Sequence, residues 1–133
     1  MFSEADLVYV VDDEASVRRS LARLLRSLGL RSLEFASGAE LLADERCAEA
    51  SCILIDVHMP QMTGYELARR LSAAAPNSQI IFITALAEEL DRWRTEDTSA
   101  IALLLKPFSE EELRAALRPA LAVQRRLNDP PTR

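Results

Sequence analysis

The sequence feature that most constrains the fold is a short apolar run that ends in a single carboxylate. The run Ile53–Ile55 leads directly into Asp56, and Pro60 and Gly64 follow in the next segment. An apolar run of this length between turn residues is typical of a buried β-strand. In open α/β sheets, ligands bind beyond the carboxyl ends of the strands, which is where Asp56 would lie. We therefore interpret Asp56 as a candidate nucleophile at a functional edge of a sheet.

Similar β-rich runs alternate with segments of helical periodicity along the whole chain. The expected strands cover residues 7–11, 32–35, 52–55, 79–83 and 101–105. The expected helices cover about 15–28, a short segment through Leu41 and Leu42, residues 64–74, a segment with Leu86, Leu90 and Trp93, and a last segment with Leu113, Leu117 and Leu121. This alternation predicts an α/β fold, with a doubly wound five-stranded parallel sheet and helices on both faces.

Helix-end signals support these positions. Gly29 follows the first helix and predicts a C-terminal cap there. The segments Ser37–Glu40 and Ser109–Glu112 both match the capping box, in which a serine and a glutamate three residues later satisfy the first backbone groups of a helix. Pro119 lies about ten residues into the last helix, where we expect it to kink or end that helix.

The length of the chain indicates one domain. With 133 residues, it is long enough for one domain with a sizeable core and too short for two. We expect residues 1–122 to form this domain, and residues 123–133, which include a Pro-Pro pair, to form a C-terminal tail or linker. Cys47 and Cys52 do not suggest a disulfide framework, and Cys52 is expected to be a small buried side chain.

Charge and hydropathy narrow the possible functions. A hydrophobic content of 49% with 28% charged residues is ordinary for a soluble globular protein. The longest apolar runs are about five residues, too short to span a membrane. The amino terminus has no basic-then-apolar signal pattern, so we expect a cytoplasmic protein. The net charge of −5 argues against direct nucleic acid binding by this segment, because such binding depends on a basic surface.

Polar residues stand at the ends of four of the five expected strands. Asp12 and Asp13 follow the first strand, Asp56 the third, Thr84 the fourth and Lys106 the fifth. Because the carboxyl ends of parallel strands share one edge, we expect these side chains to converge. Each has an ordinary structural interpretation by itself, such as helix capping by the first two acids. Their occurrence at successive strand ends favours a single functional site.

Four segments of the chain resemble the receiver domains of two-component response regulators. These segments are VYVVDDE, IDVHMPQMTG, FITA and LLKPF; they occur in the family's order and at its spacing, and the similarity covers roughly residues 7–121. The resemblance implies a flavodoxin-like strand order of 2-1-3-4-5. The stretch VVDDEASVRRSLARLL resembles, in particular, receivers that precede LuxR-type helix-turn-helix output domains.

The resemblance implies a signalling domain that catalyses only its own phosphoryl transfer and dephosphorylation. Asp56 is the implied phosphoacceptor, and a sensor histidine kinase is the implied donor. Lys106 would neutralise charge on the phosphoryl oxygens, and Thr84 would donate a hydrogen bond to the phosphoryl group once it has arrived. That contact exists only in the charged state, so it can bias a two-state loop.

The resemblance also implies a cofactor and further partners. The implied ligands of a Mg²⁺ ion are Asp13 and Asp56 directly, Asp12 largely through water, and the backbone carbonyl of His58. Three crowded carboxylates need such a cation, since two unit charges at 4 Å cost roughly 4 kcal/mol at an effective dielectric of about 20. A fused C-terminal DNA-binding domain outside this chain and a homodimer are possible for the family.

Two other functions are compatible with parts of the pattern. A pseudo-receiver would be a protein-interaction module that is never phosphorylated, but the complete acid, hydroxyl and lysine set argues against it. Haloacid-dehalogenase-type phosphatases also use an aspartyl nucleophile, but they need a second aspartate two residues later, where this chain has His58. His58 would lie beside the path of an attacking water, so we expect it to influence the lifetime of an aspartyl phosphate.

Leu103 departs from the family pattern, which usually has an aromatic residue three positions before the lysine. A leucine cannot report phosphorylation by the same ring movement, and we expect this smaller apolar side chain to repack. The alternative is that the fourth helix is the moving part, because its end, Thr95–Ser99, is polar and expected to be locally weak. Trp93 is expected to pack inward because of its helical spacing with the preceding leucines.

Overall fold

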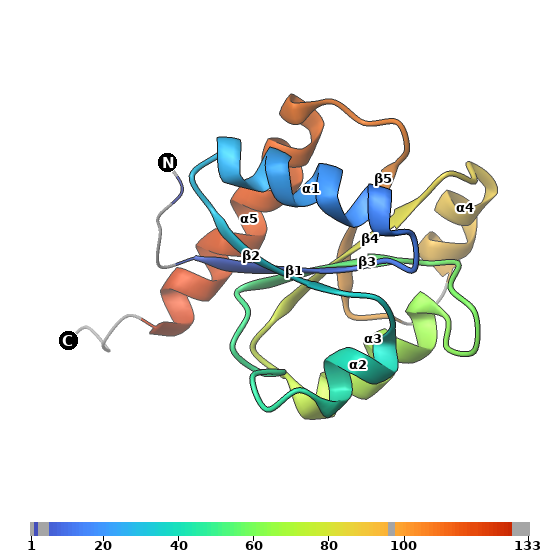
Figure 1. Cartoon of the computed structure of the whole chain (residues 1–133), viewed down its shortest axis with the longest axis horizontal. Helices are drawn as coiled ribbons and strands as arrows, with labels where there is room; N and C mark the ends of the chain where they lie inside the picture. The colour runs from blue at the N-terminus through green and yellow to red at the C-terminus, as the bar shows by residue number, and fades with distance from the viewer. Residues whose placement is uncertain (1, 3–5, 96–97, 129–133) are drawn as a thin grey trace.

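The computed structural model describes residues 2, 6–95 and 98–128, with side chains described up to residue 123. Five parallel strands form one sheet in the order β2-β1-β3-β4-β5 (Figure 1). The strands are β1 (Leu7–Val11), β2 (Arg31–Phe35), β3 (Cys52–Asp56), β4 (Gln79–Thr84) and β5 (Ala100–Leu105). The predicted fold class and strand order are confirmed.

Helices cover both faces of the sheet. They are α1 (Ala15–Ser27), α2 (Gly38–Ala43), α3 (Gly64–Ala74), α4 (Glu88–Thr95) and α5 (Glu110–Asn128). Helices α1 and α5 lie on one face, and α2 and α3 lie on the other (Figure 1). Among the described residues, no helix combines the length and the apolar character that crossing a bilayer requires.

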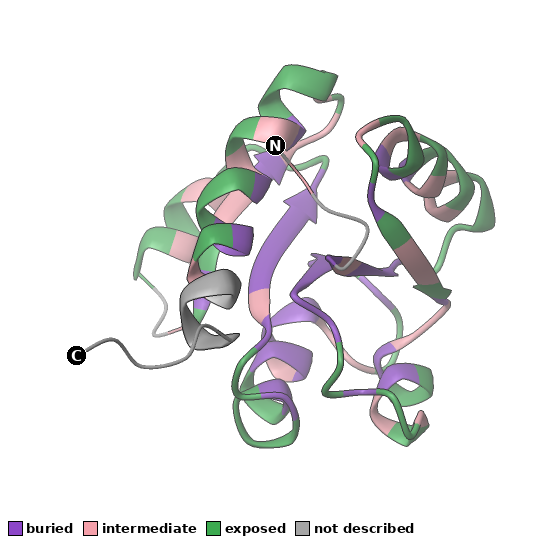
Figure 2. Ribbon diagram, turned by 90° about the vertical axis from the view of Figure 1, so that its left-hand side faces the viewer, coloured by how far each residue is buried: buried purple, intermediate pink, exposed green. Residues whose placement is uncertain are grey.

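The core consists of one apolar cluster on each face of the sheet, as strand periodicity requires. In β3, Cys52 and Leu54 contribute to the cluster beneath α1 and α5, whereas Ile53 and Ile55 contribute to the cluster beneath α2 and α3. Every residue of β3 is buried, and β3 lies between β1 and β4, so Asp56 ends a central strand. Figure 2 shows that buried residues concentrate in the strands, whereas the helices carry many of the exposed ones. The expectation that Cys52 is a small buried side chain is also confirmed.

The cap after the first helix and the capping box at Ser109–Glu112 are confirmed, and the box at Ser37–Glu40 forms in part, because the Glu40 carboxylate accepts from the N–H of Ala36. Gly29 has φ of 84°, and its N–H donates to the carbonyl of Arg26 at 2.9 Å. A left-handed residue of this kind is the usual stop after a helix, and glycine adopts it without steric cost. At the start of α2 the Ser37 hydroxyl accepts from the N–H of Glu40 at 3.1 Å. The capping box at Ser109–Glu112 has both of its hydrogen bonds.

Helix α5 does not end at Pro119 but continues to Asn128. A proline inside a helix costs about 3 kcal/mol, because it removes a hydrogen bond and crowds the preceding turn. Here Pro119 is exposed, whereas Leu117 and Leu121 on either side of it are buried against the sheet. Burying a leucine side chain contributes about 1.5–3 kcal/mol, so the packing of these two residues offsets the cost.

Helix α4 differs from the expected apolar stripe. It begins at Glu88, so Leu86 precedes the helix and is 42% exposed, which corrects the expectation that Leu86 points inward. Trp93 does pack inward as predicted: it is partly buried against the α2 and α3 cluster, and its Nε1 donates to the carbonyl of Ala100 at 3.3 Å. Leu103 is partly buried against the same cluster. Of the segment expected to be weak, residues 96 and 97 lie outside the described residues.

Candidate functional site

The strand register brings the ends of the central strands to one level. In the sheet, Val11 of β1 pairs with Ile55 of β3, and Asp56 pairs with Ile83 of β4. Thr84 is the last residue of β4 and pairs with Leu105, the last residue of β5. The polar residues that follow or end these strands are Asp12, Asp13, Asp56, Thr84 and Lys106. They lie at the carboxyl edge of the sheet, as the sequence predicted.

Three carboxylates form the centre of the site. Each of Asp12, Asp13 and Asp56 offers an oxygen, and these oxygens lie within 4.8 Å of one another. Asp12 and Asp56 are buried, with 1% and 7% of their surface exposed, whereas Asp13 is exposed. The two buried carboxylates keep defined positions because backbone donors hold them: the N–H of Glu14 donates to Asp12 Oδ1 at 2.9 Å, and the N–H of His58 donates to Asp56 Oδ1 at 3.2 Å.

Lys106 places an ammonium group beside this cluster. Its Nζ lies 3.2 Å from Oδ2 of Asp12, and its backbone N–H donates to the carbonyl of Thr84 at 2.8 Å. Arg18, from the first turns of α1, donates to the backbone carbonyl of Asp12 at 2.7 Å. The ammonium of Lys106 carries one positive charge against the three carboxylates, so the centre of the site keeps an excess of negative charge.

The pKa of Asp56 reflects both its burial and this excess of negative charge. Burial, followed by repulsion from Asp12, raises the pKa of Asp56 from 3.8 to about 6. Attraction to Lys106 and the hydrogen bond from the His58 N–H act in the opposite direction, and Asp13 adds a smaller repulsion. The nearby positive groups therefore do not fully neutralise the Asp56 carboxylate, and a cation bound at this edge would supply the missing positive charge.

Gly64 allows α3 to start directly beside Asp56. Its N–H donates to the carbonyl of Val57 at 2.9 Å. A Cβ at this position would lie 2.8 Å from the Asp56 carbonyl oxygen and 2.9 Å from Val57 Cα, distances that Cβ atoms essentially never show. The side chain of Thr63 caps the helix by accepting from the N–H of Glu66 at 3.2 Å. A residue with any side chain at position 64 would push the helix away from the end of β3, which holds Asp56.

Thr84 is fully buried at the end of β4. Its hydroxyl accepts a hydrogen bond from the N–H of Leu86 at 3.1 Å. A hydroxyl can donate one hydrogen bond while it accepts another, so the Thr84 proton can serve a further acceptor at this edge. The β4–α4 connection is thus tied to Thr84 through Leu86.

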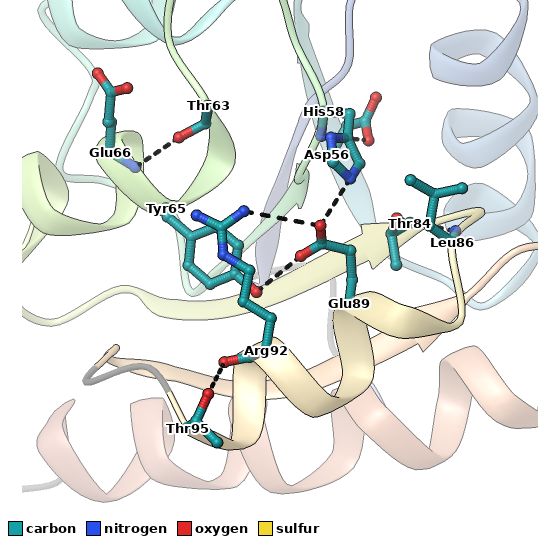
Figure 3. A network of polar contacts seen from close by, with 10 residues as sticks. All are labelled: Asp56, His58, Thr63, Tyr65, Glu66, Thr84, Leu86, Glu89, Arg92 and Thr95. Atoms are coloured by element: carbon teal, nitrogen blue, oxygen red, sulfur yellow. Dashed lines mark hydrogen bonds and ion pairs between the residues drawn. The ribbon is translucent and has the colours of Figure 1, made fainter.

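Glu89 is a site residue that the sequence analysis missed. Its carboxylate is buried and lies 3.0 Å from Nε2 of His58, and the hydroxyl of Tyr65 donates to it at 3.1 Å (Figure 3). Arg92, one turn later in α4, lies 3.8 Å from the same carboxylate. The apolar stripe expected in this helix did not include Glu89, so the sequence did not separate Glu89 from acids that face solvent. The single histidine of the chain was the available indication of a polar contact here.

Comparison with known proteins identifies the relatives of the chain. The family model of the response regulator receiver domain matches residues 8–118. The response regulator protein TodT of Pseudomonas putida is 35% identical over 132 residues, which cover 98% of this chain and 58% of TodT. The transcriptional regulatory protein TdiR of Thauera aromatica is 36% identical over 126 residues, covering 94% of this chain and 55% of TdiR. The chain therefore spans just over half the length of these relatives.

A solved structure supports the same relationship. The chemotaxis protein CheY4 of Vibrio cholerae superposes with a TM-score of 0.77 at 29% sequence identity. The superposition covers 87% of this chain and 98% of CheY4. The likeness therefore extends over nearly the whole of that protein.

Proposed function

This chain belongs to the response regulator receiver domain family, and on that premise we propose that Asp56 accepts a phosphoryl group from a sensor histidine kinase in a Mg²⁺-dependent reaction. The observation that carries the proposal is the cluster of three carboxylates beside Lys106 at the carboxyl edge of the sheet. A buried carboxylate with a raised pKa at such an edge is typical of a reactive group rather than a structural ion pair.

The donor set fits Mg²⁺, which prefers oxygen ligands and commonly uses one or two carboxylates together with phosphate oxygens. Oxygens of Asp12, Asp13 and Asp56 lie within 4.8 Å of one another. We assign Asp13 and Asp56 as direct ligands, Asp12 as a ligand largely through water, and the backbone carbonyl of His58 as a further ligand. When bound, the cation supplies charge neutralisation for the phosphoryl oxygens.

In the proposed transfer, a carboxylate oxygen of Asp56 attacks the phosphorus of a phosphohistidine. The phosphorus–nitrogen bond breaks, its electron pair stays on the imidazole nitrogen, and an acyl phosphate forms on Asp56. Lys106, now 3.2 Å from Asp12, provides an ammonium group close enough to pair with a phosphoryl oxygen. The chemistry of the chain is confined to this transfer and to hydrolysis of the product.

We assign the Thr84 hydroxyl to the arriving phosphoryl group, to which it would donate a hydrogen bond. In this structure the hydroxyl accepts a hydrogen bond from the N–H of Leu86, which links it to the β4–α4 connection. A shift of Thr84 toward the phosphoryl group would therefore pull on the segment that leads into α4. Such a coupling between a local hydrogen bond and a helix position is the usual form of a phosphorylation switch.

The place of this chain in a larger protein is also a proposal. We assign residues 1–122 to the receiver domain and residues 123–133 to a tail or linker. This chain spans just over half the length of these relatives, which are named as response or transcriptional regulators. These facts favour a fused C-terminal DNA-binding domain as the output. We further propose a cytoplasmic protein that is able to form a homodimer.

The proposal predicts that the chain takes up one phosphoryl group from acetyl phosphate when Mg²⁺ is present. The measurement is the intact mass after incubation with and without the cation, and the fluorescence of Trp93, the single tryptophan, provides a second readout with beryllofluoride. Uptake that requires Mg²⁺ supports the proposal. If the mass and the fluorescence both stay unchanged, the chain is a pseudo-receiver that acts through binding alone.

Replacing His58 with asparagine is expected to shorten the lifetime of the aspartyl phosphate by about threefold. The imidazole reaches from the loop beside Asp56 to Glu89 in α4, 3.0 Å away, and the shorter asparagine cannot span that distance. Water would then reach the phosphoryl group more easily. The decay of phosphorylated protein, followed by mass spectrometry, measures the effect, and an unaltered decay rate would show that His58 has no part in it.

A further inference from the structure

Helix α4 contacts neighbouring elements through a buried carboxylate, in addition to the packing of Trp93. Among the residues of α4, all of which the structure describes, Glu89 is the one that is buried; only 6% of its surface is exposed. Removing a carboxylate from water is costly unless charged and polar partners replace the lost hydration. An apolar residue would serve the same packing position at lower cost. The presence of a carboxylate at this position therefore indicates that its hydrogen bonds and ion pairs have a function.

The contacts of Glu89 reach several elements. His58 Nε2, from the β3–α3 loop, lies 3.0 Å from Oε1, and the Tyr65 hydroxyl, from α3, donates to Oε2 at 3.1 Å (Figure 3). Arg92 of α4 lies 3.8 Å from Oε1, and its guanidinium stacks 4.3 Å above the ring of Tyr65. Both carboxylate oxygens are thus occupied by donors whose directions fix the position of the helix.

His58 connects this network to the candidate acceptor. Its backbone N–H donates to Asp56 Oδ1 at 3.2 Å, while its imidazole contacts Glu89. One residue therefore touches both the proposed phosphoacceptor and α4. The imidazole is 47% exposed, so its position beside Asp56 is not fixed by burial and depends on the contact with Glu89.

We propose that Glu89 is a positioning residue for the phosphorylated site: by holding the His58 imidazole against α4, it closes the space beside Asp56 and slows hydrolysis of the aspartyl phosphate. The inference rests on the proposed function, because it concerns the lifetime of the phosphorylated form. In that hydrolysis, a water oxygen attacks phosphorus and the bond between phosphorus and the Asp56 oxygen breaks. The Asp56 carboxylate leaves with the electron pair, and inorganic phosphate departs with the proton released to solvent. The position of α4 thereby sets how long the signal persists.

The test is a cycle of Glu89→Gln and His58→Asn, each alone and both together. Each protein is phosphorylated with acetyl phosphate and Mg²⁺, freed of the donor, and its decay is followed by intact mass. We expect Glu89→Gln to speed decay by up to about threefold in the wild-type background, the effect expected for His58→Asn itself, and to have no effect in the His58→Asn background. Asp91→Asn is the matched control, because Asp91 lies on the same helix with 88% of its side chain exposed, and its decay should equal that of the wild type.

The outcomes separate this inference from the proposed function. If the wild type takes up no phosphoryl group, both fail. If it does, and Glu89→Gln decays like the wild type or speeds decay equally in both backgrounds, the proposed function stands and the positioning role of Glu89 is overturned. Should Glu89→Gln not fold, as judged by circular dichroism, Tyr65→Phe replaces it in the same cycle. That variant keeps the ring under Arg92 and removes the hydroxyl that donates to Glu89.

Discussion

Replacing Asp56 with asparagine is expected to abolish phosphoryl uptake and to reduce the modified fraction to background. The amide has no anionic oxygen to attack phosphorus, and its oxygen is a much weaker nucleophile than a carboxylate. The substitution keeps the size of the side chain, and the amide oxygen can still accept from the His58 N–H at the position now occupied by Oδ1. The loss therefore reports chemistry rather than a change of fold. Intact mass after incubation with acetyl phosphate and Mg²⁺ measures it.

A matched substitution makes the result specific. Asp91→Asn removes an exposed carboxylate of α4 that lies 4.0 Å from Arg94 of the same helix, and it should leave uptake at the wild-type level. Continued uptake by Asp56→Asn would assign the acceptor role to another residue. A peptide map of the modified protein would then identify that residue.

The sheet and the converging site residues follow from local signals. The strands β1 and β3 supply residues alternately to the two core clusters, so each is apolar along almost its whole length. A short run of this kind between turn residues is the signal that predicts a buried strand. Once strands alternate with helices, parallel pairing places every carboxyl end at one edge. Asp12, Asp56 and Lys106 therefore converge for topological reasons, without any knowledge of side-chain packing.

The features that the sequence analysis missed depend on tertiary packing. Leu86 was expected to face inward, but α4 starts two residues later and the Leu86 N–H is used by the Thr84 hydroxyl. Glu89 occupies the buried position instead, and it is stable there because donors from three different segments surround it. Helix α5 passes Pro119 because burial on both sides of the proline offsets its cost. A local sequence pattern does not predict these features, because each depends on contacts between residues that are distant in the sequence.

The two kinds of residue have different parts in the proposed signal. The carboxylates and Lys106 lie on strand ends, where a rigid sheet fixes their geometry. His58 and Glu89 lie on a loop and on a helix with few buried side chains, so small changes of position are cheap there. The proposed phosphorylation chemistry thus lies on the strand ends, and its proposed timing depends on a loop and on a helix with few buried side chains.

Removal of the Asp56 charge is expected to stabilise the protein in the absence of divalent cations, and only above about pH 4. The pKa of Asp56 is raised from 3.8 to about 6, so folding disfavours its charged form. Below pH 3.8 the carboxyl is protonated in both the folded and the unfolded chain, and the folded state bears no penalty. Between pH 3.8 and about 6 the unfolded chain ionises first, so the free energy of unfolding falls as the pH rises; above about pH 6 the loss is constant.

The size of this loss gives a measurable difference. A pKa raised from 3.8 to about 6 corresponds to about 3 kcal/mol at most, and we expect about 2 kcal/mol because water at the open edge of the sheet screens part of the repulsion. Urea unfolding in EDTA at pH 4 and at pH 8 should therefore show Asp56→Asn near the wild type at pH 4 and about 2 kcal/mol more stable at pH 8. Adding Mg²⁺ at pH 8 should narrow the gap, because the cation stabilises the wild type more. A gap of equal size at both pH values would mean that the crowded charges of Asp12, Asp13 and Asp56 do not strain the folded protein, and that the carboxylate needs no cation to be stable there.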